Sequence, residues 1–262
     1  MNFKKLALAI VCAGGAMAAT VPAQAANWLM LQGTERDSAA GRAKVWGFIQ
    51  PEAQYVKGTT VQAGAWKGSP MQANTIAPDR ASTATMNIRR ARIGVRGQGF
   101  PLDGKTNYFI LAELGHNGIT APGPNRFGAT YLTDASVTLN HIPGARFRVG
   151  MFKTPGAEEG LQAIHVFDYI NFTSVTDQLL LERYFAHDGS GTYVKSAADN
   201  ANAGGANPPI TGVGAFRDIG AQLFDTFKFG AWEASYAAMI GNGNGLNAQD
   251  NNNAKDYYGY MS

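Results

Sequence analysis

MNIRRARIGVRGQG, residues 86–99, combines four arginines with apolar residues that alternate along the chain. A guanidinium stays charged at any ordinary pH, so it is not buried without a partner. Because side chains alternate between the two faces of a strand, Arg90, Arg92 and Arg96 share one face, and Ile93 lies on the other. The stretch therefore predicts a strand with one ionic face and one apolar face.

A period of two recurs along the chain and predicts eight strands, most of them about as long as a tilted strand needs to cross a bilayer. We expect these strands at 44–56, 86–99, 105–115, 129–141, 145–153, 217–226, 229–241 and 255–262. Their connections alternate between long ones, at 57–85, 116–128, 154–216 and 242–254, and tight ones, at 101–104, 142–144 and 227–228. This alternation is typical of outer-membrane barrels and not of soluble sandwiches. The predicted fold class is all-β, an antiparallel transmembrane β-barrel.

In such a barrel the apolar face of each strand meets lipid and the polar face lines the lumen. An arginine near the bilayer midplane costs roughly 2–4 kcal/mol, so the row of three arginines is predicted to face inward. Arg89 falls on the lipid face but near the strand end, where its stem reaches the interface. The same alternation predicts lipid-facing side chains at Ala91, Ile93, Val95, Ala135, Val137, Leu139, Phe147, Val149, Met151, Trp232, Ala234, Tyr236 and Ala238. It predicts inward-facing side chains at Asp134, Ser136, Thr138, Asn140, Arg146, Arg148, Glu233 and Ser235.

Five inward arginines are the predicted pore-lining, anion-contacting residues: Arg90, Arg92, Arg96, Arg146 and Arg148. A tight turn at 101–104 sets Arg92 opposite Glu113, so Arg92 is equally interpreted as half of a structural ion pair. The other four lack an obvious acid on the neighbouring strand, where Asn140 and Thr138 face Arg146 and Arg148. These four are the better candidates for contact with a permeating anion. Any anion preference is local, because acidic residues also point inward, at Glu52, Glu113, Asp134 and Glu233.

Residues 1–25 have the pattern of a secretory signal peptide: a positive start at Lys4 and Lys5, an apolar core, and a small-x-small cleavage site before Ala26. The apolar core is too short for a comfortable transmembrane helix. The only cysteine, Cys12, lies inside this segment without a lipoprotein motif. The mature chain therefore has no disulfide, cysteine-ligated zinc, iron–sulfur cluster or c-type haem. We expect export to the cell outer membrane, with 26–43 as an N-terminal periplasmic segment before a partial barrel at 44–262.

Other functional classes find little support. Without Lys4 and Lys5 the chain keeps 20 basic residues against 19 acidic ones, which is too balanced for a nucleic-acid-binding protein. The histidines are scattered, and neither an HExxH nor a GxSxG motif occurs. A solvated loop is favoured over a calcium site at Asp250. We therefore expect no enzyme activity, no cofactor and no metal site; an outer-membrane hydrolase is the weaker alternative.

Four segments resemble the phosphate-selective porin O/P family of Gram-negative outer membranes: IRRARIGVRGQG (88–99), LTDASVTLNHIPGARFRVGMFKTPGAEEGLQ (132–162), DYINFTSVTDQLLLERYF (168–185) and FRDIGAQLF (216–224). The resemblance implies a homotrimer of barrels, each of about sixteen strands, that conducts small anions such as phosphate. It also implies that the loop after the FK-x-P strand, here 154–216, folds into the pore. Glu158 and Glu159 would then begin a short constriction helix.

Eight strands are about half of such a barrel, so we expect the chain to be the N-terminal half of a longer porin. The alternative is a complete eight-stranded barrel, whose narrow lumen side chains would fill. The expected function is passive diffusion of small anions through an arginine-lined, water-filled barrel, with outer-membrane lipid, small anions and further copies of the chain as partners. The alternative function is a barrel that acts as a structural scaffold or sheath for a partner.

Overall fold

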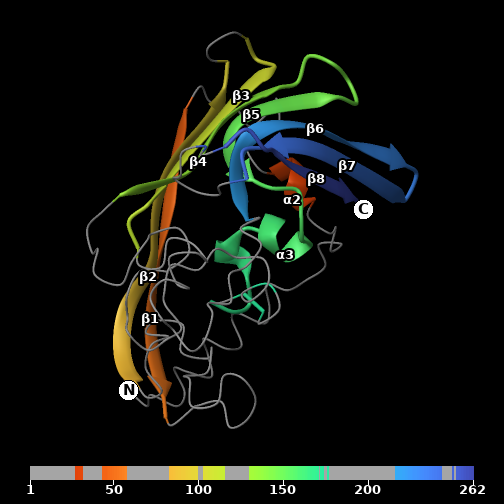
Figure 1. The fold of residues 1–262 in the computed structure, drawn as a ribbon. Helices are drawn as coiled ribbons and strands as arrows, with labels where there is room; N and C mark the ends of the chain where they lie inside the picture. Colours follow the sequence, from red (N-terminus) through yellow and green to blue (C-terminus); the bar gives the residue numbers. More distant parts are fainter. Residues whose placement is uncertain are drawn as a thin grey trace, which may run out of the picture.

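The fold is seen in a computed structural model, which describes residues 27–31, 43–57, 83–99, 103–115, 130–170, 172–173, 176, 216–243, 250 and 252–262. Within them, eight strands form one antiparallel sheet in chain order (Figure 1). The strands are β1 (Lys44–Val56), β2 (Thr83–Gln98), β3 (Thr106–Glu113), β4 (Tyr131–Leu139), β5 (Arg146–Lys153), β6 (Arg217–Phe229), β7 (Trp232–Gly241) and β8 (Asp256–Met261). The predicted all-β class is confirmed, and the described sheet is open, with β1 and β8 as its edges.

Each predicted strand overlaps an observed one, and the boundary errors reach three residues at the start of β2 and on both sides of the β6–β7 hairpin. The tight turn predicted at 227–228 is wrong, because β6 continues to Phe229, which pairs with Trp232. The turn is Gly230-Ala231, where Gly230 has a φ of 63°. Two-residue hairpin loops need a positive φ at their first position, which glycine adopts without steric cost.

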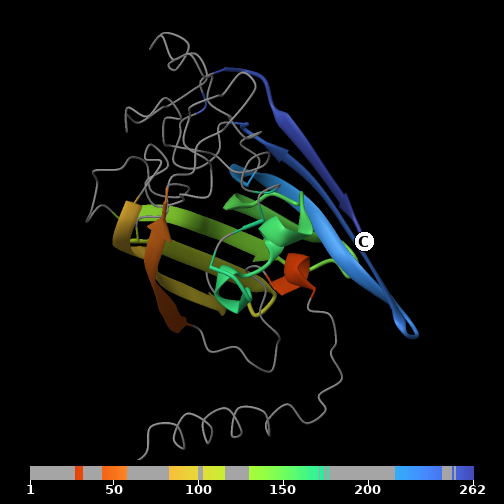
Figure 2. The same ribbon diagram turned by 90° about the horizontal axis from the view of Figure 1, so that it is seen from below.

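The predicted signal peptide, 1–25, and the interiors of the predicted loops at 57–85 and 116–128 lie outside the described residues. Three short helices are described: α2 (Trp28–Leu31), α3 (Glu158–Leu161) and η1 (Ile164–Val166). All three lie on the concave side of the curved sheet (Figures 1 and 2). None of these described helices combines the length and the apolar character that crossing a membrane requires.

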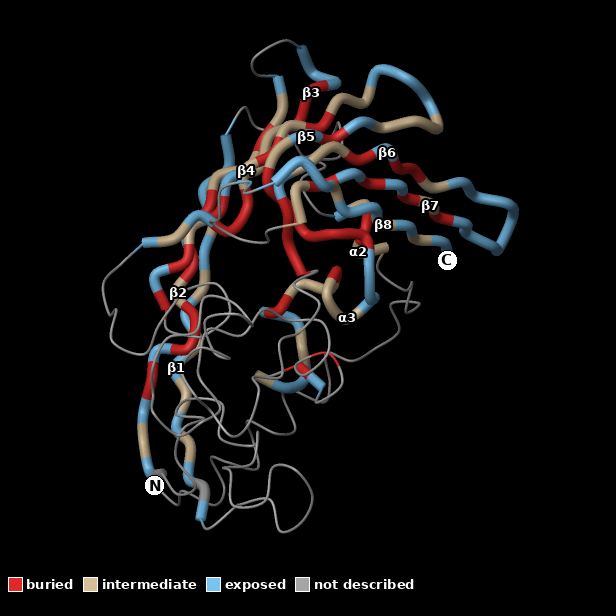
Figure 3. The backbone as a smooth tube through the Cα atoms, viewed as in Figure 1, coloured by how far each residue is buried: buried red, intermediate tan, exposed pale blue. Residues whose placement is uncertain are grey.

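The two faces of the sheet differ in composition, as two neighbouring rows of paired residues illustrate. One row, Tyr108–Val137–Val149–Ala221–Ile240–Tyr257, runs across six strands on the convex face. The next row, Asn107–Thr138–Arg148–Gln222–Met239–Tyr258, lies on the concave face, and its first five members are buried. Buried and exposed positions alternate visibly along β7 (Figure 3).

Exposed apolar side chains occur on every strand, and one example from each is Val45, Ile93, Ile110, Leu132, Phe147, Leu223, Trp232 and Tyr257. The predicted outward row in β5 keeps its register as far as Met151, which pairs with Ala135 and Ile219, although Met151 itself is buried. Met151 follows Gly150, whose φ of 122° interrupts the ordinary strand conformation.

A β-bulge corrects the predicted position of Arg89. Gln50 pairs with Arg90 and Pro51 pairs with Ile88, so Arg89 is an extra residue in β2. An extra residue shifts the alternation by one, and Arg89 and Arg90 are both 1% exposed. Arg89 therefore does not face outward, as its spacing from Arg90 predicted. The partner strand carries a proline at the bulge, where the missing N–H removes one bond from the ladder.

A row of three paired glycines crosses β5, β6 and β7. Gly150 of β5 pairs with Gly220 of β6, which pairs with Gly241 of β7. A Cβ atom at Gly150 would lie 2.1 Å from the Ala135 carbonyl oxygen, and one at Gly220 would lie 2.1 Å from that of Ile240. Glycine kinks of this kind let a sheet curve sharply, so this row contributes to the concave shape that encloses the site.

Candidate functional site

Three buried ion pairs connect strands across the concave face. Arg89 lies 3.2 Å from Glu52, Arg92 lies 2.6 Å from Glu113, and Arg217 lies 3.2 Å from Asp134. The last pair spans β5, because Asp134 is on β4 and Arg217 is on β6. Three of the four acids that the sequence placed inside are thus engaged with arginines.

The Arg92–Glu113 pair occupies the predicted register, with the two residues directly opposite each other. The Arg92 Nε donates to one Glu113 oxygen, and the other oxygen accepts bonds from the Ala91 and Gly115 N–H groups, both at 2.9 Å. Charge-assisted bonds of this number offset the desolvation of a buried carboxylate. Arg92 is therefore part of the structure of the wall as well as of the cavity described below.

Two of the predicted anion-contacting arginines are enclosed by protein. The Arg90 Nη1 donates to the Gln50 side chain at 2.9 Å and to the Ile170 carbonyl at 2.8 Å. The Arg148 Nε donates to the Thr138 hydroxyl at 3.1 Å, and its guanidinium lies 4.3 Å from the centre of the Phe224 ring. Both side chains are 1% exposed. Neither guanidinium therefore contacts the open space on the concave side directly.

Arg146 has an acidic neighbour that the sequence argument missed. Its Nε lies 3.3 Å from an oxygen of Asp225, so the expectation that no acid faces it is wrong. The tight connection before Arg146 predicts its neighbours on the preceding strand, β4, alone. Asp225 lies on the following strand, β6, which the long connection at 154–216 separates from β5 in sequence.

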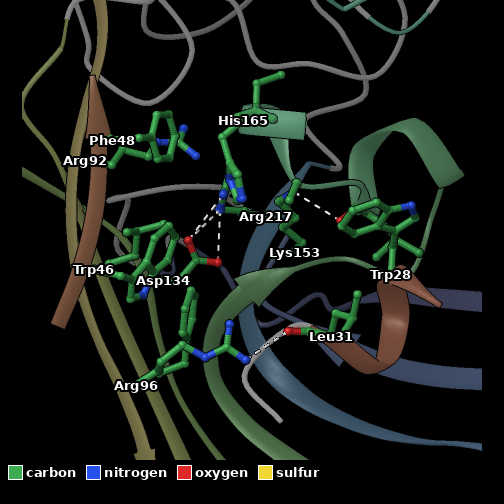
Figure 4. Close-up of a pocket in the computed structure, with 15 residues that line it drawn as sticks. Trp28, Leu31, Trp46, Phe48, Arg92, Arg96, Asp134, Lys153, His165 and Arg217 are labelled. Carbon is green, nitrogen blue, oxygen red and sulfur yellow. Dashed lines mark hydrogen bonds and ion pairs between the residues drawn. The ribbon is translucent and has the colours of Figure 1, made fainter. Parts of the chain in front are cut away.

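A cavity of about 220 Å³ lies between the concave face of the sheet and the short helices (Figure 4). It is lined by Trp28, Leu31, Trp46, Phe48, Arg92, Arg96, Phe109, Leu111, Asp134, Lys153, Leu161, Ala163, Ile164, His165 and Arg217. Four of these side chains are cationic and one, Asp134, is a carboxylate. Of the five predicted arginines, Arg92 and Arg96 line this cavity, whereas Arg90, Arg146 and Arg148 do not.

Lys153 and Arg217 are cavity residues that the sequence argument did not identify. They pair at the ends of β5 and β6. The Lys153 Nζ donates to the Gln162 carbonyl at 2.7 Å and to the Leu161 carbonyl at 3.3 Å, while the Arg217 guanidinium lies over Phe216. Both residues lie in segments quoted above for a family resemblance. That resemblance was the signal in the sequence that could have identified them.

His165 lies at the edge of the same cavity, on η1. Its ring centre is 5.3 Å from that of Phe48 and 6.0 Å from that of Trp46. Partial burial lowers the pKa of His165 below its ordinary value, and the positive charges of Lys153 and Arg92 lower it further. The imidazole is therefore neutral at pH 7 and acquires a charge only in more acidic solution.

The N-terminal helix α2 forms the opposite wall of the cavity with Trp28 and Leu31. Asn27 accepts a bond from the Met30 N–H at 3.1 Å and thereby caps this helix. Its amide nitrogen donates hydrogen bonds to the Glu233 carboxylate at 2.6 Å and to the Ser235 hydroxyl at 2.7 Å, both on β7. The described part of the predicted periplasmic segment at 26–43 thus packs against the concave face of the sheet.

The described part of the loop at 154–216 also covers this face. Leu161 packs with Leu29 and Phe224 in one apolar cluster, and Ile164 packs with Phe172 and Phe216 in another. The predicted constriction residues do not line the cavity: Glu158 accepts the Tyr260 hydroxyl at 2.7 Å, and Glu159 accepts the Thr173 N–H at 2.6 Å. Both carboxylates instead form hydrogen bonds that connect α3 to neighbouring segments.

Among the described residues, no group of three or more His, Cys, Asp or Glu side chains is arranged to hold a metal ion. The arrangement instead offers cationic groups set among aromatic rings, which suits the binding of an anion. No protein-family model, no curated protein and no solved structure matches this chain.

Proposed function

We propose that the chain is part of an outer-membrane porin that conducts small anions, as its resemblance to the phosphate-selective porin O/P family implies. The single observation that carries this proposal is the reversed polarity of the sheet. Its convex face exposes apolar side chains on all eight strands, while its concave face buries arginines, lysine and carboxylates. Proteins in water rarely expose apolar patches of this extent, whereas lipid hydrocarbon stabilises them.

The open edges of the sheet have a consequence for assembly. Backbone N–H and C=O groups along β1 and β8 cannot remain unpaired in hydrocarbon, so a membrane form needs further strands at these edges. We propose closure into a barrel of about sixteen strands and association into a trimer. The concave face then becomes the wall of the lumen, and α2, α3 and η1 narrow it.

An anion preference follows from the charges around the cavity. An anion a few ångströms from a cationic side chain gains on the order of 1–4 kcal/mol, depending on how strongly water screens the charge. This range favours entry without trapping the ion, as conduction requires. Asp134 and Glu113 reduce the positive potential near Arg217 and Arg92. Arg96 and Lys153 both line the cavity, and their removal tests the proposal.

The experiment is single-channel recording of the assembled protein in a planar bilayer with a KCl gradient. We expect a reversal potential that indicates preference for chloride, and a smaller preference in the Arg96→Gln/Lys153→Gln variant. Lys228→Gln, at the exposed β6–β7 hairpin, is the matched control and leaves the potential unchanged. Insertion without any current would favour the scaffold or sheath, and an unchanged potential in the double variant would contradict the anion-contacting role.

A further inference from the structure

We propose that the cavity binds a small organic carboxylate with a planar apolar body, of the chemical class of benzoate. The inference rests on the proposed anion channel and narrows its solute. It derives from the composition of the walls, which match the two parts of such a molecule. The ring would meet aromatic side chains, and the carboxylate would meet cationic ones.

Part of the cavity wall is aromatic, formed by Trp28, Trp46, Phe48 and Phe109. The indole of Trp46 stacks near-parallel with Phe109 at 6.1 Å and with Phe48 at 6.3 Å, with interplanar angles of 21° and 22°. Trp28 and Leu31 face this row from α2 (Figure 4). A small inorganic anion leaves most of this apolar surface without a contact. A planar ring lying against Trp46 gains both apolar burial and ring-to-ring packing.

The charges of the cavity select a carboxylate over a neutral ring. Lys153 is buried, and its two described hydrogen bonds are to the carbonyls of Leu161 and Gln162, which carry no net charge. Arg96 lies on the opposite side, 5.7 Å from the centre of the Phe109 ring. A carboxylate placed between these two side chains can accept charge-assisted hydrogen bonds from them, which a neutral apolar ligand cannot do.

The volume limits the size of the ligand. Sites for drug-sized molecules usually measure about 300–1,000 Å³, and this cavity measures about 220 Å³. A single ring with one carboxylate is compatible with this space, whereas a nucleotide or an oligosaccharide is not. The surplus of cationic over acidic lining residues likewise disfavours cationic amines.

The first test compares benzoate, acetate and inorganic phosphate as blockers of the chloride current in the planar bilayer. Acetate has the carboxylate without the ring, and phosphate has the charge without an apolar body. We expect benzoate to interrupt the current at concentrations at least about tenfold lower than either. Equal potency of the three anions would overturn the inference while leaving the anion channel intact. Absence of chloride current in inserted protein would instead overturn the proposed function.

Two variants locate the effect. We expect Trp46→Ala to weaken block by benzoate about three- to tenfold, as loss of an aromatic contact does, and to change block by acetate little. Trp46→Leu keeps much of the wall volume and repeats the test if the alanine variant folds poorly. Trp232→Ala, on the convex face, is the control and leaves all three anions unaffected. Unchanged benzoate block in both Trp46 variants would remove the cavity from the interaction.

Discussion

The two faces of this sheet are formed by the same strands but differ in which side chains they expose and which they bury. On the convex face, Val45, Ile49 and Met86 are 67%, 69% and 86% exposed. On the concave face, Arg89 is 1% exposed and Glu113 is fully buried. This distribution differs from that of a typical water-soluble protein, and it is the basis of the proposed lipid contact of the convex face. The concave charges are tolerated because carboxylates, carbonyls, amides and hydroxyls on neighbouring segments satisfy them.

The largest effect is expected from breaking the Arg92–Glu113 pair. Glu113→Gln leaves the Arg92 guanidinium without its carboxylate partner, and the amide NH2 group that replaces one oxygen must face either Arg92 or the N–H groups of Ala91 and Gly115. Removing one member of a buried pair typically costs about 3–5 kcal/mol. Equilibrium unfolding by urea in lipid vesicles measures the loss.

A double variant separates the charge effect from a packing effect. Arg92→Met/Glu113→Met removes both charges, and such replacements are often nearly neutral because no unpaired charge remains. We therefore expect the double variant to be more stable than Glu113→Gln. A double variant as unstable as the single one would mean that shape, and not charge pairing, dominates this part of the concave face.

The convex face is tested by placing a charge on it. Ile93→Arg should destabilise the protein in lipid by roughly 2–4 kcal/mol if the side chain lies near the bilayer midplane. Ile142→Arg introduces the same charge in the β4–β5 turn, where the native side chain is also exposed, and should cost little. The measurement is again urea unfolding in vesicles. Equal costs for the two variants would indicate that the convex face meets water.

The curvature that separates the two faces depends on the glycine row. Gly220→Ala places a Cβ atom 2.1 Å from the Ile240 carbonyl oxygen, so the backbones of β6 and β7 must move apart. Overpacking of this kind typically costs 1–3 kcal/mol. Gly259→Ala in β8, where an added Cβ meets no atom within 4 Å, is the matched control. Equal melting temperatures for these two variants would show that the backbones of β6 and β7 can move apart without loss of stability.

The alternating pattern was enough to predict the strands, because a period of two is a local property of the chain. The Arg92–Glu113 register was also predictable, since the turn predicted at 101–104 sets these two residues opposite each other. The inward position of Arg89 was not, because it depends on a bulge against Pro51 of another strand. Neither was the cavity, because Lys153, Arg217 and Trp28 lie far apart in sequence and only the curved sheet brings them together.

The smallest expected effect concerns His165, which links the charge of the cavity to pH. Its pKa lies below the ordinary value because partial burial, then Lys153 and Arg92, oppose its protonation. Protonation in acidic solution adds a positive charge to the cavity wall. We therefore expect chloride preference to rise as the pH falls from 7.5 towards 5. Reversal potentials at several pH values, for wild type and His165→Gln, measure this rise.

Stability should change in the opposite direction over the same pH range. The unfolded chain binds a proton at His165 near pH 6.5, before the folded protein does, so the contribution to stability is lost as the pH falls below that value. His141→Gln is the control, since His141 lies at the β4–β5 turn beside Asp103, outside the cavity lining. It should retain the rise in chloride preference that His165→Gln removes. A rise that persists in His165→Gln would instead assign the pH dependence to another group of the pore.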